Sequence, residues 1–546
     1  MKKTTFKKLI SIPLFSLVAA GVSGCTIWDF GKTTANSGLV STAKDGSTYG
    51  APSLSLGNDG VNYSAKATSF TQSDAEHYST GYMMPSTGKV NVLVVPVIID
   101  DFSSHATDKV RNDISKAFFG DPGDTSWESL ASYYYKSSYG QLLLNGVVAP
   151  WFDCGYTSSQ LSELTYQGNI SALANSFQPT WTVLEKAVAW YKNAYSPTLS
   201  EFDSNGDAII DAVWMVYSAP DYGHDSSLDK TDFWAYTYSD LAPLYAAEGK
   251  SVSACIPFRY SWASYDFLYE GYGSSGIDAH TYIHETGHLM GLDDYYVSGT
   301  ASTYKSNYGP MGRIDMMDYN VIDHDAYSKF ALGWIKPYVV TGATSITLSP
   351  SSTTGQAILL PTEDGWHDSA FGEYILMEFY TPTLLNRKDS AAAYANGAQG
   401  FSESGVRIYH VDARILKITS QTHSYVNAIS KPESDNVYYA MAHSNSSSYN
   451  ENMGTDVSFR LVQEMDCTKK RNFDTEYESY IKNGKTYSLP LAADNSSLFQ
   501  TENVFSFALY KNSFPKTTMN NGKAFSYKAT FSEMSASSIT VDIARV

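Results

Sequence analysis

Two hydrophobic periods alternate along the first half of the chain, one typical of strands and one typical of helices. The apolar run from Lys89 to Ile99 is rich in Val and predicts a buried strand. Apolar residues at 110, 114 and 118 predict a helix over 107–119, and a similar face predicts a helix over 181–195. The run from Ala212 to Tyr217 predicts a central strand. These elements describe a mixed body of helices and strands.

Shorter segments add detail to this body. Residues 129–140 predict an aromatic-faced helix that stops at Gly140. Leu142 to Val148 predicts a strand pair around Asn145-Gly146, a dipeptide that favours hairpin turns. Residues 325–334 predict a short helix capped by Gly333, with Trp334 in the core. We expect structural rather than catalytic roles for these aromatic side chains.

The pattern changes at about residue 340, where short alternating segments separated by turn residues begin. Such spacing predicts the strands of a β-sandwich, and the fold class predicted for the whole chain is therefore α+β. The predicted strands are 345–348, 356–360, 373–379, 405–412, 524–531 and 538–543.

These patterns divide the chain into four parts. Residues 1–25 form a targeting segment, and residues 26–85, rich in Ser, Thr, Gly and Asn, predict a flexible tether. Residues 86–340 form the mixed domain. Residues 341–546 form the β-rich region, which the polar stretch 431–475 divides near 430.

The first residues have the features of an export signal. Four Lys among the first eight residues precede a short apolar run from Leu9 to Ala20, too short for a good membrane span. Val22-Ser23-Gly24-Cys25 resembles the bacterial lipoprotein box, in which the Cys is lipidated. We therefore expect a lipid anchor at Cys25 that holds the protein at the outer face of a bacterial membrane. The alternative is an ordinary cleaved signal and a secreted protein.

Charge and cysteine content narrow the function classes. The net charge of −18, from 56 acidic against 38 basic residues, argues against nucleic acid as a partner. Beyond Cys25, the three cysteines at 154, 255 and 467 allow at most one intramolecular disulfide, whose pairing the sequence does not reveal. We expect a monomer.

The stretch from Thr281 to Tyr296 carries the strongest chemical signal. His284 and His288 lie four residues apart, so a helix presents both on one face, where they can bind one metal ion. Glu285 beside them is placed to take a proton from a water on that metal. Gly291 ends the helix, and Asp294 then falls at the position of a third ligand. Two His and one Asp leave an open position on zinc, as catalytic zinc sites require.

A second segment predicts calcium binding. Asp203, Asn205, Asp207 and Asp211 alternate around Gly206, like the first nine positions of an EF-hand loop. The bidentate Glu that closes such loops is absent, because Trp214 takes its place. The alternative is a polar turn in which Asp serves turn chemistry.

These residues resemble the immune inhibitor A (M6) family of secreted bacterial metallopeptidases. The family core reads His-Glu-x-Gly-His-x-Leu-Gly-Leu-Pro-Asp-x-Tyr; here Met290 replaces the Leu before Gly291, and Asp293 replaces the Pro. Similar segments cover most of the chain after residue 85, among them Tyr133–Gly140 and Ser328–Trp334. The resemblance implies a zincin- or metzincin-like catalytic domain and zinc-dependent cleavage of extracellular proteins or peptides, with Glu285 as general base.

The metzincin likeness also implies two supporting residues. Met317, or alternatively Met316, would form the Met turn beneath the metal, and Tyr319 would hydrogen-bond the oxyanion. The alternative is that Met317 and Tyr319 are core residues.

Some alternatives stay open at the level of sequence. Glu378, His410 and Asp412 are polar residues within apolar strands; Glu378 could replace Asp294 as a ligand or support a ligating His, or all could form a buried structural network. The chain as a whole could be an anchored binding protein or adhesin on an inactive zincin body, or a metal-dependent amidase or glycan-acting enzyme.

Overall fold

The computed structural model describes the greater part of the chain from residue 82 onward, together with three short strands before it. Strands β1 (Val40–Thr42), β2 (Thr48–Gly50) and β3 (Val61–Tyr63) precede the body. The continuous described ranges are 82–164, 178–240, 242–247, 251–271, 276–297, 309–363, 370–418, 423–426, 438–441, 460–474, 476–482, 485–510 and 518–546. Cys25 and most of the stretch 431–475 lie outside the described residues.

The first sheet has the strand order β5-β4-β7-β9-β8 and is parallel except for β8. Short strand β6 (Phe152–Asp153) also pairs with β4. The buried strands predicted from the apolar runs are confirmed as β4 and β7. The bounds are β4 Gly88–Ile98, β5 Leu142–Val148, β7 Val213–Tyr217, β8 Tyr236–Ser239 and β9 Arg259–Ser264.

The predicted hairpin at Asn145-Gly146 is wrong. Strand β5 runs through both residues and pairs in parallel with β4, placing Gly146 opposite Val92. A Cβ on Gly146 would lie 2.1 Å from the Val92 carbonyl oxygen and 2.7 Å from the Phe119 ring. Glycine is therefore required by the close approach of a neighbouring strand and helix, and not by a turn.

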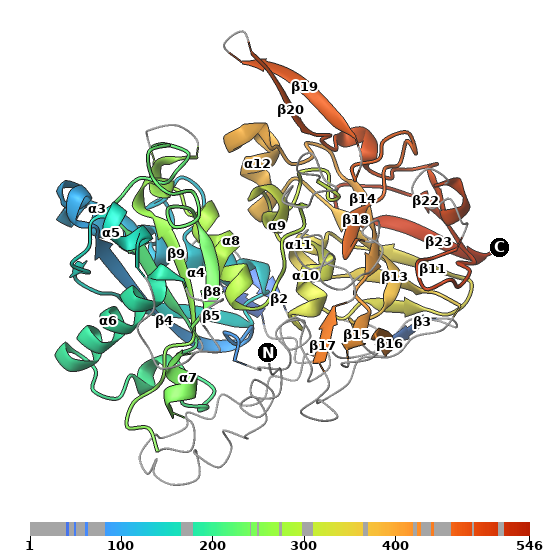
Figure 1. The fold of residues 1–546 in the computed structure, drawn as a ribbon. Coiled ribbons are helices and arrows are strands. Elements are labelled where there is room, and N and C mark those ends of the chain that lie inside the picture. Colours follow the sequence, from blue (N-terminus) through green and yellow to red (C-terminus); the bar gives the residue numbers. More distant parts are fainter. Residues whose placement is uncertain are drawn as a thin grey trace.

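Helices cover both faces of this sheet (Figure 1). The alternation along β4 sends Val90, Val92 and Val94 into one core and Leu93, Val95 and Val97 into another. Helices α3 (Asp108–Phe119) and α4 (Leu130–Ser137) pack into the first core, and α6 (Pro179–Ala194) packs into the second. All three were predicted from the sequence, α3 and α6 from their apolar periodicity and α4 from its aromatic face.

The C-terminal part contains two sheets that share one core. One sheet has the order β18-β14-β13-β12-β10-β3, and the other has the order β11-β23-β22-β21. Side chains from both, such as Ile375 and Val541, meet in a common apolar cluster. The first sheet is β10 Tyr338–Val340, β12 Ala357–Pro361, β13 Glu373–Tyr380, β14 Gly405–Asp412 and β18 Val462–Glu464 with β3. The second is β11 Thr344–Leu348, β21 Val504–Ser506, β22 Tyr527–Ser532 and β23 Ile539–Arg545.

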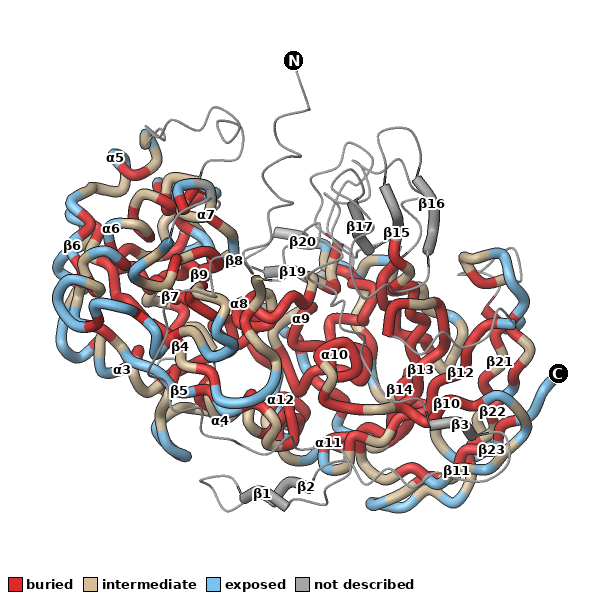
Figure 2. Tube along the Cα trace, turned by 90° about the horizontal axis from the view of Figure 1, so that it is seen from below, coloured by how far each residue is buried: buried red, intermediate tan, exposed pale blue. Residues whose placement is uncertain are grey.

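The two halves are joined by a continuous core. The other face of the β10–β14 sheet contributes Val339, Leu359 and Tyr409 to the same cluster that contains Val92 of β4. Figure 2 shows the mostly buried helices α8 (His280–Leu289), α9 (Met316–Tyr319) and α10 (Ala326–Ala331) between the two halves. Strand β3, from the segment predicted as a tether, pairs antiparallel with β10 at the edge of the C-terminal sheet. The molecule is thus a mixed helix-and-strand protein with several sheets, compatible with the predicted α+β class.

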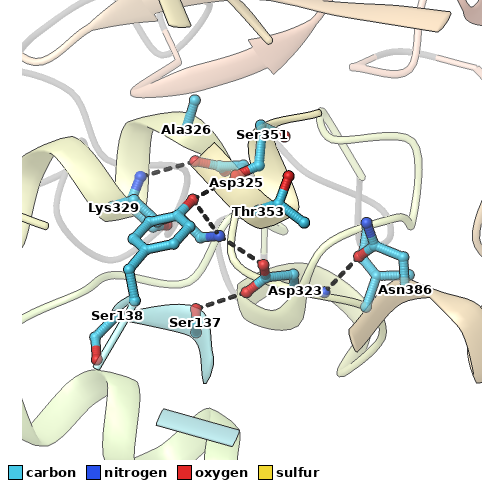
Figure 3. A network of polar contacts seen from close by, with 12 residues as sticks. Ser137, Ser138, Asp323, Asp325, Ala326, Lys329, Ser351, Thr353 and Asn386 are labelled. Carbon is cyan, nitrogen blue, oxygen red and sulfur yellow. Dashed lines mark hydrogen bonds and ion pairs between the residues drawn. The ribbon is translucent and has the colours of Figure 1, made fainter. Parts of the chain in front are cut away.

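A buried ion pair reinforces the junction between the halves (Figure 3). Lys329 Nζ lies 2.5 Å from Asp323 Oδ2 and donates to the Tyr139 hydroxyl at 3.1 Å. The other carboxylate oxygen of Asp323 accepts a hydrogen bond from the Ser137 hydroxyl at 2.6 Å. The backbone N–H of Asp323 donates to the Asn386 side chain at 3.0 Å. Tyr139 thus has a buried structural contact, in keeping with the structural role expected for the aromatic residues of its segment.

The remaining elements are short. The predicted helix near 325–334 is confirmed as α10 (Ala326–Ala331), with Gly333 at a positive φ of 78°. No helix within the described residues has the length and apolarity needed to cross a bilayer. The others are α5 Ser158–Ser162, α7 Ala242–Ala247, α9 Met316–Tyr319, α11 Ser351–Thr354, α12 Arg387–Ala391, β15 Ile415–Ile418, β16 His423–Val426, β17 Tyr438–Met441, β19 Tyr477–Lys482 and β20 Lys485–Pro490, with 3-10 turns η4 Tyr265–Tyr269 and η5 Leu384–Asn386.

Candidate metal centre

Helix α8 (His280–Leu289) carries the histidine pair and lies at the centre of the molecule. It ends as predicted: Gly291 has a φ of 95°, and the next N–H, of Leu292, donates to the Gly287 carbonyl at 3.0 Å. Tyr134 of α4 donates to the Ile283 carbonyl at 2.7 Å. The helix is therefore fixed at its end and along its side by buried contacts.

Three donor atoms converge beside this helix. His284 Nε2 lies 3.1 Å from His288 Nε2 and 3.1 Å from Asp294 Oδ1, and His288 Nε2 lies 3.3 Å from the same Asp294 oxygen. Ligand bonds of about 2.0–2.2 Å in a tetrahedral zinc site place ligand atoms about 3.3–3.6 Å apart. The two imidazoles and the carboxylate therefore have the spacing and chemistry of a metal-ligand set.

Each imidazole is oriented through its second nitrogen. His284 Nδ1 donates to the Met316 carbonyl at 2.8 Å, and His288 Nδ1 donates to the Leu292 carbonyl at 2.7 Å. A proton on Nδ1 leaves the Nε2 lone pair available for a cation. The backbone thus selects the tautomer that a metal ligand needs.

The electrostatics of the group favour a positive charge. Burial opposes ionisation, yet the neighbouring Asp294 carboxylate raises the pKa of His288 to about 10. Burial likewise opposes ionisation of Asp294, but the two imidazoles hold the pKa of its carboxyl below the ordinary value. A metal ion bound through the Nε2 lone pairs would supply the same positive charge without a second proton on the imidazoles.

Glu285 lies next to these ligands and is held by a neighbouring strand. Thr237 of edge strand β8 donates to Glu285 Oε2 at 3.0 Å and lies 2.9 Å from the Glu285 carbonyl. Burial raises the pKa of the Glu285 carboxyl. His284, Glu285 and His288 each offer a ligand atom, and these atoms lie within 4.8 Å of one another. A buried carboxylate at this position can exchange a proton with a molecule bound beside His284 and His288.

Met317 and Met316 contribute different atoms beneath the helix. The Met316 carbonyl accepts the His284 hydrogen bond, and the Met317 side chain packs against the backbone of Gly287. A Cβ on Gly287 would lie 2.6 Å from Met317 Sδ, so glycine permits this close approach. The arrangement resembles the support that a Met turn gives to a metal site.

The Tyr319 side chain is packed against other side chains of the protein. The Arg313 guanidinium lies 4.9 Å from the centre of its ring, and the ring packs against an apolar cluster that includes Ile314 and Tyr394. Burial raises the pKa of its hydroxyl. These contacts favour the core alternative for Tyr319 over the oxyanion role.

The polar residues of the C-terminal strands form buried networks. Glu378 Oε1 accepts from the Tyr409 hydroxyl and, at 3.3 Å, from the Ala326 N–H that begins α10. His410 lies 2.9 Å from Glu373, and Asp412 pairs with Arg414 at 2.6 and 2.8 Å. Glu378 thus has its own partners, while Asp294 is the carboxylate placed against the histidines.

The 203–211 loop satisfies its side chains internally. Asp203 accepts from the backbone N–H groups of Gly206, Asp207 and Ala208, and Asp211 accepts from Ser204. Within the described residues, the closely convergent groups of His, Cys, Asp and Glu do not include this loop. This geometry favours the polar-turn alternative, and calcium binding stays a prediction.

Cys154, Cys255 and Cys467 are free thiols. Burial raises the pKa of Cys154 to about 11 and that of Cys255 to about 12. Burial also raises the pKa of Cys467 to about 11, so all three thiols are protonated at neutral pH in the metal-free protein.

Sequence reasoning missed two contributors to the centre, Thr237 and the Met316 carbonyl. Thr237 precedes Glu285 by 48 residues, and its strand carries an unremarkable Tyr-Thr-Tyr-Ser sequence. A backbone carbonyl leaves no residue-type signal at all.

Comparison with known proteins adds no assignment to this geometry. No protein-family model matches the chain, and no curated protein matches its sequence.

Proposed function

We propose that this protein is a zinc-dependent endopeptidase of the type that its sequence resembles, the M6 metallopeptidases with a zincin-like catalytic domain. The observation that carries the proposal is the convergence of His284, His288 and Asp294 within 3.3 Å, with Glu285 beside them. Extracellular proteins or peptides are the expected substrates.

His284, His288 and Asp294 would hold the zinc ion, and their donor set suits it, because zinc accepts imidazole nitrogen and carboxylate oxygen in a four-coordinate site. When bound, zinc supplies Lewis-acid polarisation and lowers the pKa of water towards neutrality.

The chain's own residues supply proton transfer and orientation. Glu285 accepts a proton from the attacking water and returns it to the leaving amine, and its raised pKa suits both steps. Thr237 holds the carboxylate in position, and it belongs to the exposed edge of the sheet, where an extended peptide can pair with β8.

The test is Glu285→Gln, which keeps the shape of the side chain but removes the base. We expect normal zinc content and a loss of at least about 100-fold in hydrolysis of a denatured protein. Glu163→Gln, on an exposed residue, is the matched control and should leave turnover unchanged. Unchanged turnover in the Glu285 variant would refute the assignment. A wild type that binds zinc but cleaves no peptide would favour the adhesin or glycan alternatives.

We also propose that Cys25 carries the lipid that anchors the protein outside the cell. The support is the sequence Val22-Ser23-Gly24-Cys25 after a basic and apolar segment. Cys25→Ser should move the protein from the membrane fraction to the medium or block its processing, measured by fractionation and mass spectrometry of the N-terminal peptide. Retention of a fully processed variant in the membrane would contradict the anchor.

A further inference from the structure

A second group of metal-ligating side chains lies away from helix α8, on the turns that follow β7 and β9. These neighbouring parallel strands end at the same edge, with Tyr217 opposite Ser264. Asp221 and His224 follow β7, and Asp266 follows β9. The carboxyl ends of adjacent parallel strands are a common place for ligand-binding residues.

The three side chains point at one another. His224 Nδ1 contacts Asp221 Oδ2 and lies 3.2 Å from Asp266 Oδ2, and one ligand atom from each residue falls within 4.8 Å of the others. The carboxylates are fixed by the backbone: Asp221 Oδ1 accepts from the Gly223 N–H at 2.6 Å, and Asp266 Oδ2 accepts from the Asp221 N–H at 3.2 Å.

One oxygen of this group is left without a partner. Asp266 Oδ1 is buried and accepts no hydrogen bond from any described residue. The group holds two carboxylates against one imidazole. A divalent cation would balance this charge and give the orphaned oxygen a partner.

We propose that Asp221, His224 and Asp266 form a second metal site, one for a transition ion such as Zn²⁺ or Mn²⁺. The imidazole nitrogen distinguishes this group from a calcium site, which takes six to eight oxygens. The site is structural. It joins the turn after β7 to η4, and the chain after η4 leads into α8, with the Asp278 N–H donating to the Leu268 carbonyl at 2.8 Å.

This inference does not depend on the proposed peptidase activity, and the experiment separates the two. The measurement is zinc content per chain by mass spectrometry after dialysis against weak chelator, in the full protein. Wild type should hold two zinc ions, and His224→Ala should hold one while keeping peptidase activity. His224 suits the test because its side chain is 53% exposed, so its removal leaves the core intact. Asp225→Asn, on a partly exposed neighbour whose carboxylate accepts from Ser227, is the matched control and should keep two.

A second arm uses His284→Ala/His288→Ala, which lacks the first site. This variant should still bind one zinc ion and gain thermal stability when Zn²⁺ or Mn²⁺ is added, since a ligand that binds only the folded state stabilises it. Adding His224→Ala should abolish both effects. If zinc content is the same with and without His224 in both backgrounds, the three residues form only an ion pair and the proposal is overturned. If the variant without both histidines does not fold, the comparison of zinc content between wild type and His224→Ala decides.

Discussion

The side chains of the candidate metal centre are oriented by both nearby and distant parts of the sequence. The Nδ1 atoms of His284 and His288 are held by the carbonyls of Met316 and Leu292, and Glu285 is held by Thr237. Asp294, ten residues after His284, completes the donor set. The chemistry of each residue is ordinary, and the site arises from their shared orientation.

The charge balance of this centre predicts a pH dependence for the metal-free protein. The pKa of His288 is raised to about 10 in the folded state, from an ordinary value of about 6.5. A raised folded-state pKa contributes stability that is complete below the unfolded value and is lost as pH rises through the folded value. We therefore expect chelator-treated protein to lose on the order of a few kcal/mol of stability between about pH 6.5 and about pH 10.

Denaturant unfolding across this pH range, with and without chelator, measures the effect. The zinc-loaded protein is the control, because zinc replaces the proton and should flatten the alkaline loss. A metal-free protein whose stability is constant from pH 6.5 to 10 would show that His288 is neutral when folded.

At the scale of elements, β5 shows how one local signal can be read in two ways. Asn145-Gly146 has the composition of a hairpin turn, but the parallel register with β4 puts Gly146 against the Val92 carbonyl. Periodicity was reliable for α3 and α6, where packing demands one buried face, and the continuous apolar run identified β4, which is buried on both faces. The dipeptide signal failed because glycine serves close approach as well as turns.

The parallel pairing of β5 predicts that alanine substitution lowers stability at Gly146 and has little effect at Asn145. Gly146→Ala should destabilise the protein by about 1–3 kcal/mol, because the new Cβ meets backbone atoms of a central strand that cannot move aside. Asn145→Ala, on an exposed neighbour in the same strand, should change stability by less than about 0.5 kcal/mol. Calorimetry of both variants checks this. A hairpin turn would instead make Asn145 sensitive.

For the whole molecule, a continuous core makes the two halves one cooperative structure around α8, α9 and α10. The Lys329–Asp323 pair at this junction is almost fully buried, with side-chain exposures of 2% and 7%. The boundary expected at 340 marks a change in strand pattern along the sequence, and the apolar packing continues across it.

Removing one partner of the buried pair should therefore destabilise the entire fold. Lys329→Met leaves Asp323 charged and unpaired, at a cost of about 3–5 kcal/mol. Lys109→Met breaks a pair in which Lys109 is 74% exposed and Asp113 9% exposed. Asp113 keeps the hydrogen bond from Tyr269, so this change should cost less than about 1 kcal/mol. Thermal unfolding should show one transition shifted down for the Lys329 variant. An equal loss of thermal stability in both variants would contradict the conclusion that the Lys329–Asp323 pair is buried at the junction.

The sequence by itself determined the local geometry of this protein. Helical spacing placed His284 and His288 on one face, Gly291 ended the helix, and the periodicity identified most helices and strands, because these features depend on neighbours a few residues away. Only the tertiary structure placed Glu378 in a separate network, brought the Met316 carbonyl and Thr237 to the site, and set Gly146 against a neighbouring strand. Those choices depend on contacts between distant segments, which no local pattern encodes.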